Sequence, residues 1–353
     1  MHTLHFPIRA SIALALAAAS APGLAQDAPP AAYEQQCRQL AQRQYPAADM
    51  SPPAAGGQCE PVGLYYGIGA ARDYARARQC AFAAKDNDQP FQERHGVLMM
   101  LYANGLGVRR DYQLAQKAAC DAGGAPAEIA ERLAHLEKMA AAAPGSGRPI
   151  DVCDDITSGY MGGYCASIAA QLGEQTRGAA FAKLVASWTP QEKQALARLE
   201  QAAMRFADER SGSEVDRTGT LRDAFSIREE QRQLTDFRAS IAAFERGALP
   251  RHSKADLARL DADMNAAYQQ LRRMPEPSHS TFKFHGIQQT QRTWLAYRDA
   301  WVVFGKAKYP AVPAHAWQAH FTQKRTAMLK ELVPLMEWGA PGVKPAAPAN
   351  SAR

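Results

Sequence analysis

The chain has 353 residues, of which 46% are hydrophobic and 22% charged, and it carries a formal net charge of +6. Such a length allows two or three domains with cores of their own, and the composition is that of a globular protein. The excess of positive charge lies after residue 253 and is scattered, which argues against a nucleic-acid partner and favours a solvated basic face over contact with an anionic envelope surface.

Residues 1–25 have the pattern of an export signal. His2, His5 and Arg9 form a short basic start, residues 11–21 form an apolar segment, and small residues at Gly23 and Ala25 predict cleavage after Ala25. No later run is long and apolar enough to span a bilayer. We therefore expect a periplasmic or secreted mature protein without an integral membrane segment.

The abundance of helix-forming residues and the scarcity of β-branched runs predict an all-α fold. We expect a short helical-repeat solenoid over residues 33–139 and a linker over 140–150. One or two small antiparallel helical-bundle units then follow, over 151–247 and 254–338. The Gly-, Pro- and Ala-rich residues 339–353 are expected to form a disordered tail.

Six cysteines fall in the first half of the chain, and none has the Cys-x-x-Cys spacing of a zinc or thioredoxin-type site: Cys37, Cys59, Cys80, Cys120, Cys153 and Cys165. In an oxidising compartment this even number predicts three disulfides, each stabilising by roughly 2–4 kcal/mol. Fifteen connectivities are open. Sequence proximity favours 37–59, 80–120 and 153–165. The last pair is the firmest choice, whereas the partners of the other two can be exchanged.

Residues 63–138 contain an internal repeat with an offset of about 38 residues, in the range of helix-turn-helix arrays. The stretch 64–77 (LYYGIGAARDYARA) recurs at 101–115 (LYANGLGVRRDYQLA). The pattern resembles the Sel-one-like repeat, a relative of the tetratricopeptide repeat.

The repeated residues have evident physical roles. Gly67 and Gly69, like Gly105 and Gly107, allow a turn with positive φ. Asp73 and Asp111 are placed to cap the following helix, and Ala77 and Ala115 are small enough for close helix packing. The Gly67-x-Gly69 pair has no preceding strand and no third glycine, so we do not expect a nucleotide site.

Two longer helical units follow the linker. The first begins with a Gly-rich segment closed by Cys153 and Cys165. Its sequence pattern then predicts helices over 168–186, 189–210 and 221–246, with a polar loop over 211–220. The second predicts helices over 254–274, 286–308 and 314–338. The two units look like copies of one design, although the first carries a degraded version of the motif described next.

An aromatic helix organises the last unit. Trp294, Tyr297, Trp301 and Phe304 share one helical face, which predicts core packing. The motif Gln291-x-x-Trp-x-x-Tyr-Arg298-Asp299 follows a Leu260-x-x-x-Met-Asn265-x-x-Tyr268 segment. It precedes Phe321-Thr-x-x-Arg325-x-x-x-Leu329. Together these segments resemble the LprI-type lysozyme-inhibitor domain, a small helical secreted module.

The resemblance implies a set of family-motif residues that are candidates for a partner interface: Asn265, Tyr268, Gln291, Trp294, Tyr297, Arg298, Asp299 and Arg325. For Arg298 and Asp299 the favoured interpretation is a bond within the domain that orients neighbouring helices. If an interface exists, exposed Trp, Tyr and Arg side chains are its expected anchors.

We predict no catalytic, cofactor or metal site. His279, His285, His315 and His320 are spaced by six and five residues, so neither pair shares a helical face as metal-binding histidines at i and i+4 do. Acidic residues cluster at Asp208, Glu209, Glu214 and Asp216. No aromatic sugar platform flanks them, so a glycosidase or cation site is disfavoured against an exposed loop.

The sequence supports two hypotheses about the function of the protein. The first is an exported protein-binding module that resembles LprI-type lysozyme inhibitors and acts by surface complementarity, with a lysozyme or another cell-wall hydrolase as partner. The basic charge opposes long-range attraction to basic c-type lysozymes, which makes the nearly neutral unit 151–247 the more plausible contact surface. The alternative is an envelope scaffold that binds peptides or proteins through its helical repeats.

Overall fold

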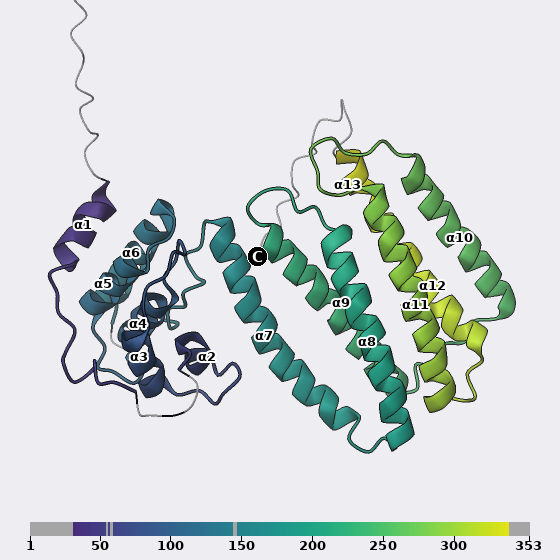
Figure 1. Ribbon diagram of the computed structural model, residues 1–353, viewed down its shortest axis with the longest axis horizontal. Helices are drawn as coiled ribbons and strands as arrows, with labels where there is room; N and C mark the ends of the chain where they lie inside the picture. The colour runs from purple at the N-terminus through teal and green to yellow at the C-terminus, as the bar shows by residue number, and fades with distance from the viewer. Residues whose placement is uncertain (1–30, 54–55, 57–58, 144–146, 339–353) are drawn as a thin grey trace, which may run out of the picture.

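The computed structural model describes residues 31–53, 56, 59–143 and 147–338, which form helices and no strand (Figure 1). The prediction of an all-α fold is confirmed. The expected export signal and C-terminal tail lie outside the described residues. Among the helices of the described part, none has the length and apolarity needed to cross a membrane.

The first half contains α1 (Ala32–Leu40), α2 (Pro61–Tyr66), α3 (Tyr74–Ala83), α4 (Glu93–Asn104), α5 (Tyr112–Ala122) and α6 (Pro126–Ala141). They gather at one end of the molecule (Figure 1). Helix α4 lies at the centre, and eight of its residues from Val97 to Asn104 are buried on every face. A short helix that is apolar all round has to be enclosed by its neighbours, and α2, α3 and α5 supply that enclosure.

The internal repeat of the sequence corresponds to two similar helical hairpins, α2–α3 and α4–α5. Gly67 and Gly105 end the first helix of each hairpin with φ of 79° and 69°. Asp73 and Asp111 then accept hydrogen bonds from backbone N–H groups in the first turn of the second helix. The turn and cap roles predicted for these residues are therefore the ones observed.

Three disulfides stabilise this half, and two of the predicted pairings were wrong. The bonds are Cys37–Cys120, Cys59–Cys80 and Cys153–Cys165. Only the last agrees with the pairing by sequence proximity. The N-terminal helix α1 packs against α5, which brings Cys37 to Cys120, and Cys59 precedes α2 in the hairpin that carries Cys80. Helix packing, and not distance along the chain, selects the partners.

The second half contains α7 (Gly159–Leu184), α8 (Pro190–Ser213), α9 (Arg222–Glu245), α10 (Lys254–Arg273), α11 (Phe284–Lys308), α12 (Ala314–Glu331) and α13 (Val333–Trp338). Helices α7–α9 and α10–α12 are arranged alike. Helix α7 packs on α9 as α10 packs on α12, and the middle helices α8 and α11 pack on each other. They run antiparallel, since Gly286 lies against Ser213 at one end and Lys308 pairs with Glu192 at the other.

One hydrophobic core joins the two sets of three helices. The aromatic face of α11 lies in it, with Trp294, Tyr297, Trp301 and Phe304 all buried, so the predicted core role of that face is confirmed. Tyr297 stacks on Phe206 of α8 with ring centroids 5.3 Å apart, and Trp301 stacks on Phe321 of α12 at 4.4 Å. Helices α8, α11 and α12 therefore share large aromatic side chains in this core.

Helix α7 begins earlier than the sequence indicated, at Gly159 instead of residue 168. The hydroxyl of Ser158 caps the helix by accepting a hydrogen bond from the N–H of Met161 at 3.2 Å. Gly162 and Gly163 follow, and a side chain at Gly162 would meet Leu221 of the α9 N-cap at 2.5 Å. The glycines thus mark a close helix contact where the sequence suggested a loop.

Candidate functional site

The eight family-motif residues do not form one surface. The structure buries Trp294, Tyr297 and Arg325 in the core, exposes Asn265 and Asp299, and leaves Tyr268, Gln291 and Arg298 half-buried. The three buried residues therefore serve to hold the helices together. Of the motif residues, only the exposed and half-buried ones present a surface to a partner.

Arg298 and Asp299 form an ion pair between adjacent residues of α11, with Nη2 and Oδ1 3.2 Å apart. The Arg298 guanidinium also lies 5.2 Å from the centroid of the Trp294 ring. The bond stays within one helix, so the expected role of orienting a neighbouring helix is not what the structure shows. The pair covers the outer edge of a core tryptophan.

Arg325 has a buried partner that the sequence did not indicate. Its Nη1 donates to Oε2 of Glu214 at 2.9 Å, and its Nε donates to Gln291 at 2.9 Å. The side chains of Arg325 and Glu214 are both fully buried. The pair connects α12 to the end of α8 and so links the two sets of three helices.

The acidic cluster of the sequence is dispersed by the fold. Glu214 accepts hydrogen bonds from Arg325 in a buried ion pair. Glu209 accepts a hydrogen bond from Ser213, and Asp208 is exposed. Asp216 accepts hydrogen bonds from the N–H and hydroxyl of Thr218, and although burial alone would raise its pKa, these bonds hold that pKa below its usual value. Among these four acids we find no pair of free carboxylates facing one another.

A second polar network lies beside the first. Arg210 of α8, only 2% exposed, donates through Nε to Glu229 of α9 at 2.6 Å and through Nη2 to Glu331 of α12 at 3.3 Å. Arg232 of α9 binds the same two carboxylates. Burial alone would raise the pKa of Glu229, but Arg210 and Arg232 hold it below its usual value. Sequence reasoning missed this network, although an arginine four residues after Phe206 on the apolar face of α8 was a signal for it.

These charged groups line a cavity of about 1040 Å³. It lies between the end of α8, the start of α9, the loop over residues 274–283 and the α12–α13 junction. Phe225, Arg228, Glu229 and Arg232 share one face of α9 and line the cavity, and Leu335 of α13 also lines it. The cavity is the clearest candidate binding site.

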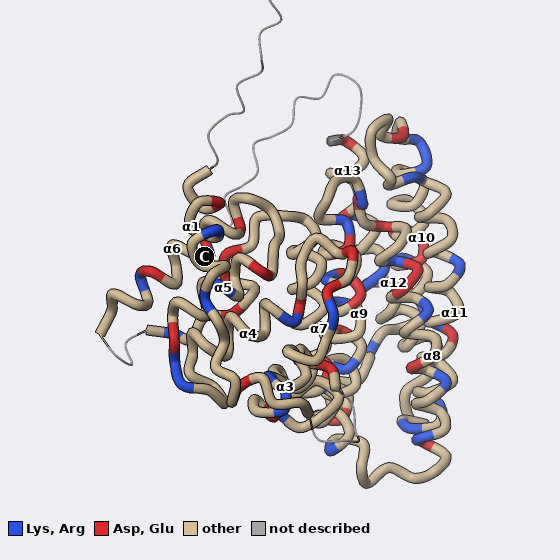
Figure 2. The backbone as a smooth tube through the Cα atoms, turned by 60° about the vertical axis from the view of Figure 1, so that its left-hand side comes forward, with Lys and Arg blue, Asp and Glu red and all other residues tan. Residues whose placement is uncertain are grey.

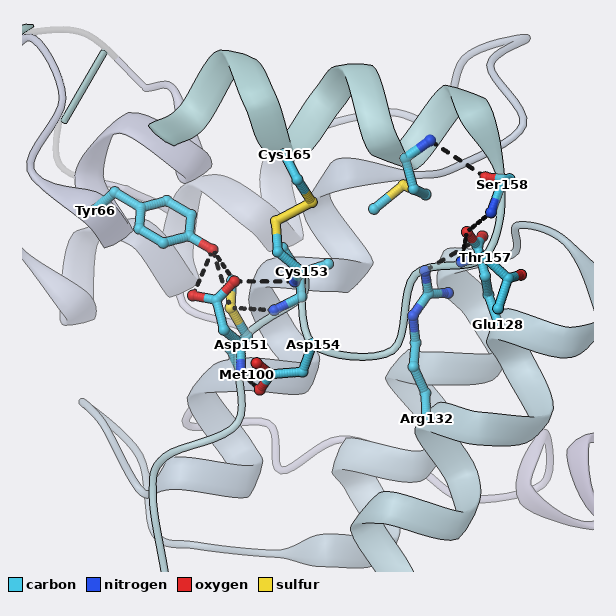
Figure 3. The surroundings of a disulfide bond; sticks show 12 residues. Tyr66, Met100, Glu128, Arg132, Asp151, Cys153, Asp154, Thr157, Ser158 and Cys165 are labelled. Carbon is cyan, nitrogen blue, oxygen red and sulfur yellow. Dashed lines mark hydrogen bonds and ion pairs between the residues drawn. A yellow bond between two sulfur atoms is a disulfide. The ribbon is translucent and has the colours of Figure 1, made fainter. Parts of the chain in front are cut away.

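A different polar cluster fixes the first half to α7 (Figure 3). The carboxylate of Glu128 accepts hydrogen bonds from the N–H groups of Thr157 and Ser158 at 2.9 and 2.7 Å and from that of Ala125. Arg132, one turn later on α6, lies 3.6 Å from the same carboxylate. Burial would raise the pKa of Glu128, yet these backbone bonds hold it below its usual value. The cluster is structural, because it positions the start of α7.

The histidines do not assemble. No group of three or more histidine, cysteine or acidic side chains arranged to hold a metal occurs among residues 31–53, 56, 59–143 and 147–338. His320 is half-buried beside aromatic rings, and its removal from water together with nearby Lys324 lowers its pKa to about 4. Figure 2 shows basic and acidic residues interspersed on the helices of both halves, as expected for a solvated surface.

Comparison with known proteins gives one family match. Residues 245–329, about a quarter of the chain, match the model of a family described as lysozyme inhibitor LprI. The match covers the end of α9 and helices α10–α12 up to Leu329. The repeats before it match no family model, and no curated protein and no solved structure matches the chain.

Proposed function

We propose that the protein is an exported, non-catalytic protein-binding module similar to LprI-type lysozyme inhibitors, with a lysozyme or another cell-wall hydrolase as its partner. The observation that carries the proposal is the family match over residues 245–329. Three disulfides in the first half support export, because such bonds persist in oxidising compartments.

The structure restricts where a partner can bind. The aromatic face of α11, the richest source of large side chains, is covered by α8, α9 and α12. We propose that a partner contacts the exposed motif residues on α10 and α11, or the surface around the cavity in the unit over residues 151–247, where Phe225 is 40% exposed. An exposed aromatic beside charged groups is a typical anchor for protein recognition.

A lysozyme-activity assay with the mature protein tests the proposal. We expect lysozyme turnover to fall as the protein is added, with saturation in the micromolar range or below. Because no covalent step is involved, inhibition should be reversed by dilution. Full lysozyme activity at micromolar concentrations of the folded protein, for lysozymes of several classes, would remove the inhibitor function.

A matched pair of variants on α10 tests whether the motif contributes contacts. Asn265 belongs to the family motif and is exposed, whereas Asp263 lies on the same helix, is also exposed and lies outside the motif. We expect Asn265→Ala to weaken inhibition by about fivefold, the ~1 kcal/mol that marks a contributing interface residue. Asp263→Ala should leave inhibition unchanged, and equal effects of the two variants would argue against a motif-based interface.

A further inference from the structure

We infer that the partner protein docks over the cavity between α8, α9 and the α12–α13 junction and fills it with an uncharged, apolar side chain. This inference rests on the proposed function and makes it more specific, because that function leaves two contact surfaces open. The exposed motif residues on α10 and α11 can add contacts, but we place the anchor of the interface at the cavity and at the face of α9 beside it.

The face of α9 beside the cavity carries two exposed apolar side chains. Leu221 is 41% exposed and Phe225 is 40% exposed. They lie one helical turn apart, since the N–H of Phe225 donates a hydrogen bond to the carbonyl of Leu221 at 3.1 Å. Of the seven large hydrophobic side chains that are exposed in the described part of the chain, Phe225 is the one that lines this cavity. Phe225 therefore connects an exposed apolar patch to the cavity.

The cavity itself offers apolar surface to a partner. Val215, Leu332 and Leu335 line it together with Phe225. Its volume of about 1040 Å³ is at the upper end of the range for sites that hold whole small molecules, so a single large side chain fits. An apolar side chain placed there removes its own surface and this lining from water, which is favourable in proportion to the area covered.

The charges around the cavity are balanced. Three arginines and four acids line it: Arg210, Arg228, Arg232, Glu214, Asp216, Glu229 and Glu331. Arg325, which pairs with Glu214, supplies a fourth positive charge. Burial would raise the pKa of Asp216 and of Glu229, but their hydrogen bonds and the arginines beside Glu229 hold each pKa below its usual value, so both groups are ionised at neutral pH. A charged occupant would lose its water without gaining a net counter-charge, so an uncharged occupant is favoured.

The apolar surface extends beyond what a small molecule in the cavity could cover. Leu221 lies outside the cavity lining, one turn before Phe225. Arg217, Arg222 and Arg228 are exposed in the same segment of the chain. Exposed aromatic and arginine side chains together are typical of protein interfaces, whose outer contacts exclude water from the anchor. A protein that inserts one side chain and rests on Leu221 covers both parts, so a protein is the occupant that fits.

Inhibition of a lysozyme by the full chain and by three variants tests the inference. Phe225→Ala removes the proposed anchor, and Ser278→Trp places a large side chain in the cavity from an exposed position of its lining. We expect each to weaken inhibition by at least about tenfold, more than the loss expected for Asn265→Ala. Met204→Ala is the matched control, because Met204 is 53% exposed on α8 and does not line the cavity. It should change inhibition by less than about twofold. The circular-dichroism spectrum of each variant checks that it is folded.

Failure of the inference and failure of the proposed function give different results. If the full chain inhibits no lysozyme, the proposed function fails and the inference falls with it. If the full chain inhibits and either Phe225→Ala or Ser278→Trp inhibits equally well, or if Met204→Ala loses as much as they do, only the inference is overturned.

Two further measurements identify other occupants of the cavity. We expect the protein alone to sediment as a monomer, and a dimer that Phe225→Ala separates would show that a second copy of the chain fills the cavity. We also expect octan-1-ol, an uncharged apolar probe, to relieve inhibition by the full chain. Saturable binding of octan-1-ol that leaves inhibition unchanged would assign the cavity to a small molecule. Either contrary result would overturn the inference.

Discussion

At the scale of single residues, the molecule depends on buried arginines paired with buried acids. Arg325 with Glu214 and Arg132 with Glu128 are each almost completely removed from solvent. An isolated charge in such a place would be very costly, so each member is retained through its partner. Arg325 and Glu214 are 111 residues apart, and no local pattern could have paired them.

The Arg325–Glu214 pair gives a direct prediction. Arg325→Leu leaves the Glu214 carboxylate buried without its main counter-charge, and we expect the free energy of unfolding to fall by about 3–5 kcal/mol. Glu214→Leu should cost a similar amount. The double variant should lose less than the sum of the two, because it leaves neither charge alone. Urea unfolding of the four proteins measures this, and strictly additive losses would contradict the pairing.

Glu128 gives a prediction about pH. Its pKa is lower in the folded protein than the usual 4.5, so its stabilisation is complete above that pH and is lost as the pH falls through the folded value. Glu128→Gln should lower the free energy of unfolding by about 1–3 kcal/mol at neutral pH and flatten its decrease below pH 4.5. Glu131→Gln, an exposed change on the same helix, is the control and should do neither. Parallel pH profiles for wild type and Glu128→Gln would refute this role.

At the scale of elements, the sequence predicted what is local and failed at what is tertiary. The glycine turns, the aspartate caps and the aromatic face of α11 were all read correctly, because each rests on spacing within one or two turns. The disulfide partners and the buried arginine network depend on which helices become neighbours, and periodicity carries no such information. The early start of α7 was missed because its glycines were assigned to a segment before the helix, whereas they permit close packing against α9.

Gly305 illustrates the same point and can be tested. A methyl group there would lie 2.4 Å from the indole ring of Trp317, where α11 meets α12. Gly305→Ala should therefore lower the free energy of unfolding by about 1–3 kcal/mol, although alanine is the better helix former. Gly178 of α7 has only an ordinary contact at 3.6 Å, and Gly178→Ala should raise that free energy by up to about 1 kcal/mol. Thermal unfolding monitored by circular dichroism compares the two, and shifts of the same sign would show that the α11–α12 contact is looser than described.

At the scale of the whole molecule, two hydrophobic cores lie side by side. One is built from α1–α6 with the start of α7, and the other from the end of α7 with α8–α13. All three disulfides belong to the first core. All five tryptophans lie at or after residue 188, beyond the last cysteine of the chain.

Reduction should therefore affect the two cores differently. We expect a reducing agent to destabilise the first core by roughly 2–4 kcal/mol per bond and to shift its calorimetric transition to lower temperature. The transition seen by tryptophan fluorescence should stay nearly unchanged, since it reports the second core. Equal shifts by both probes would show that the chain unfolds as one cooperative unit.

Helix α7 enters both cores without interruption. Met161 and Ile168 near its start are buried in the first core, and Phe181 near its end is buried in the second. Its 26 residues extend over about 39 Å at the usual rise per residue. A straight helix anchored at both ends keeps the separation of the two cores constant. If each end of the molecule bound a ligand, the distance between the two ligands would therefore stay constant.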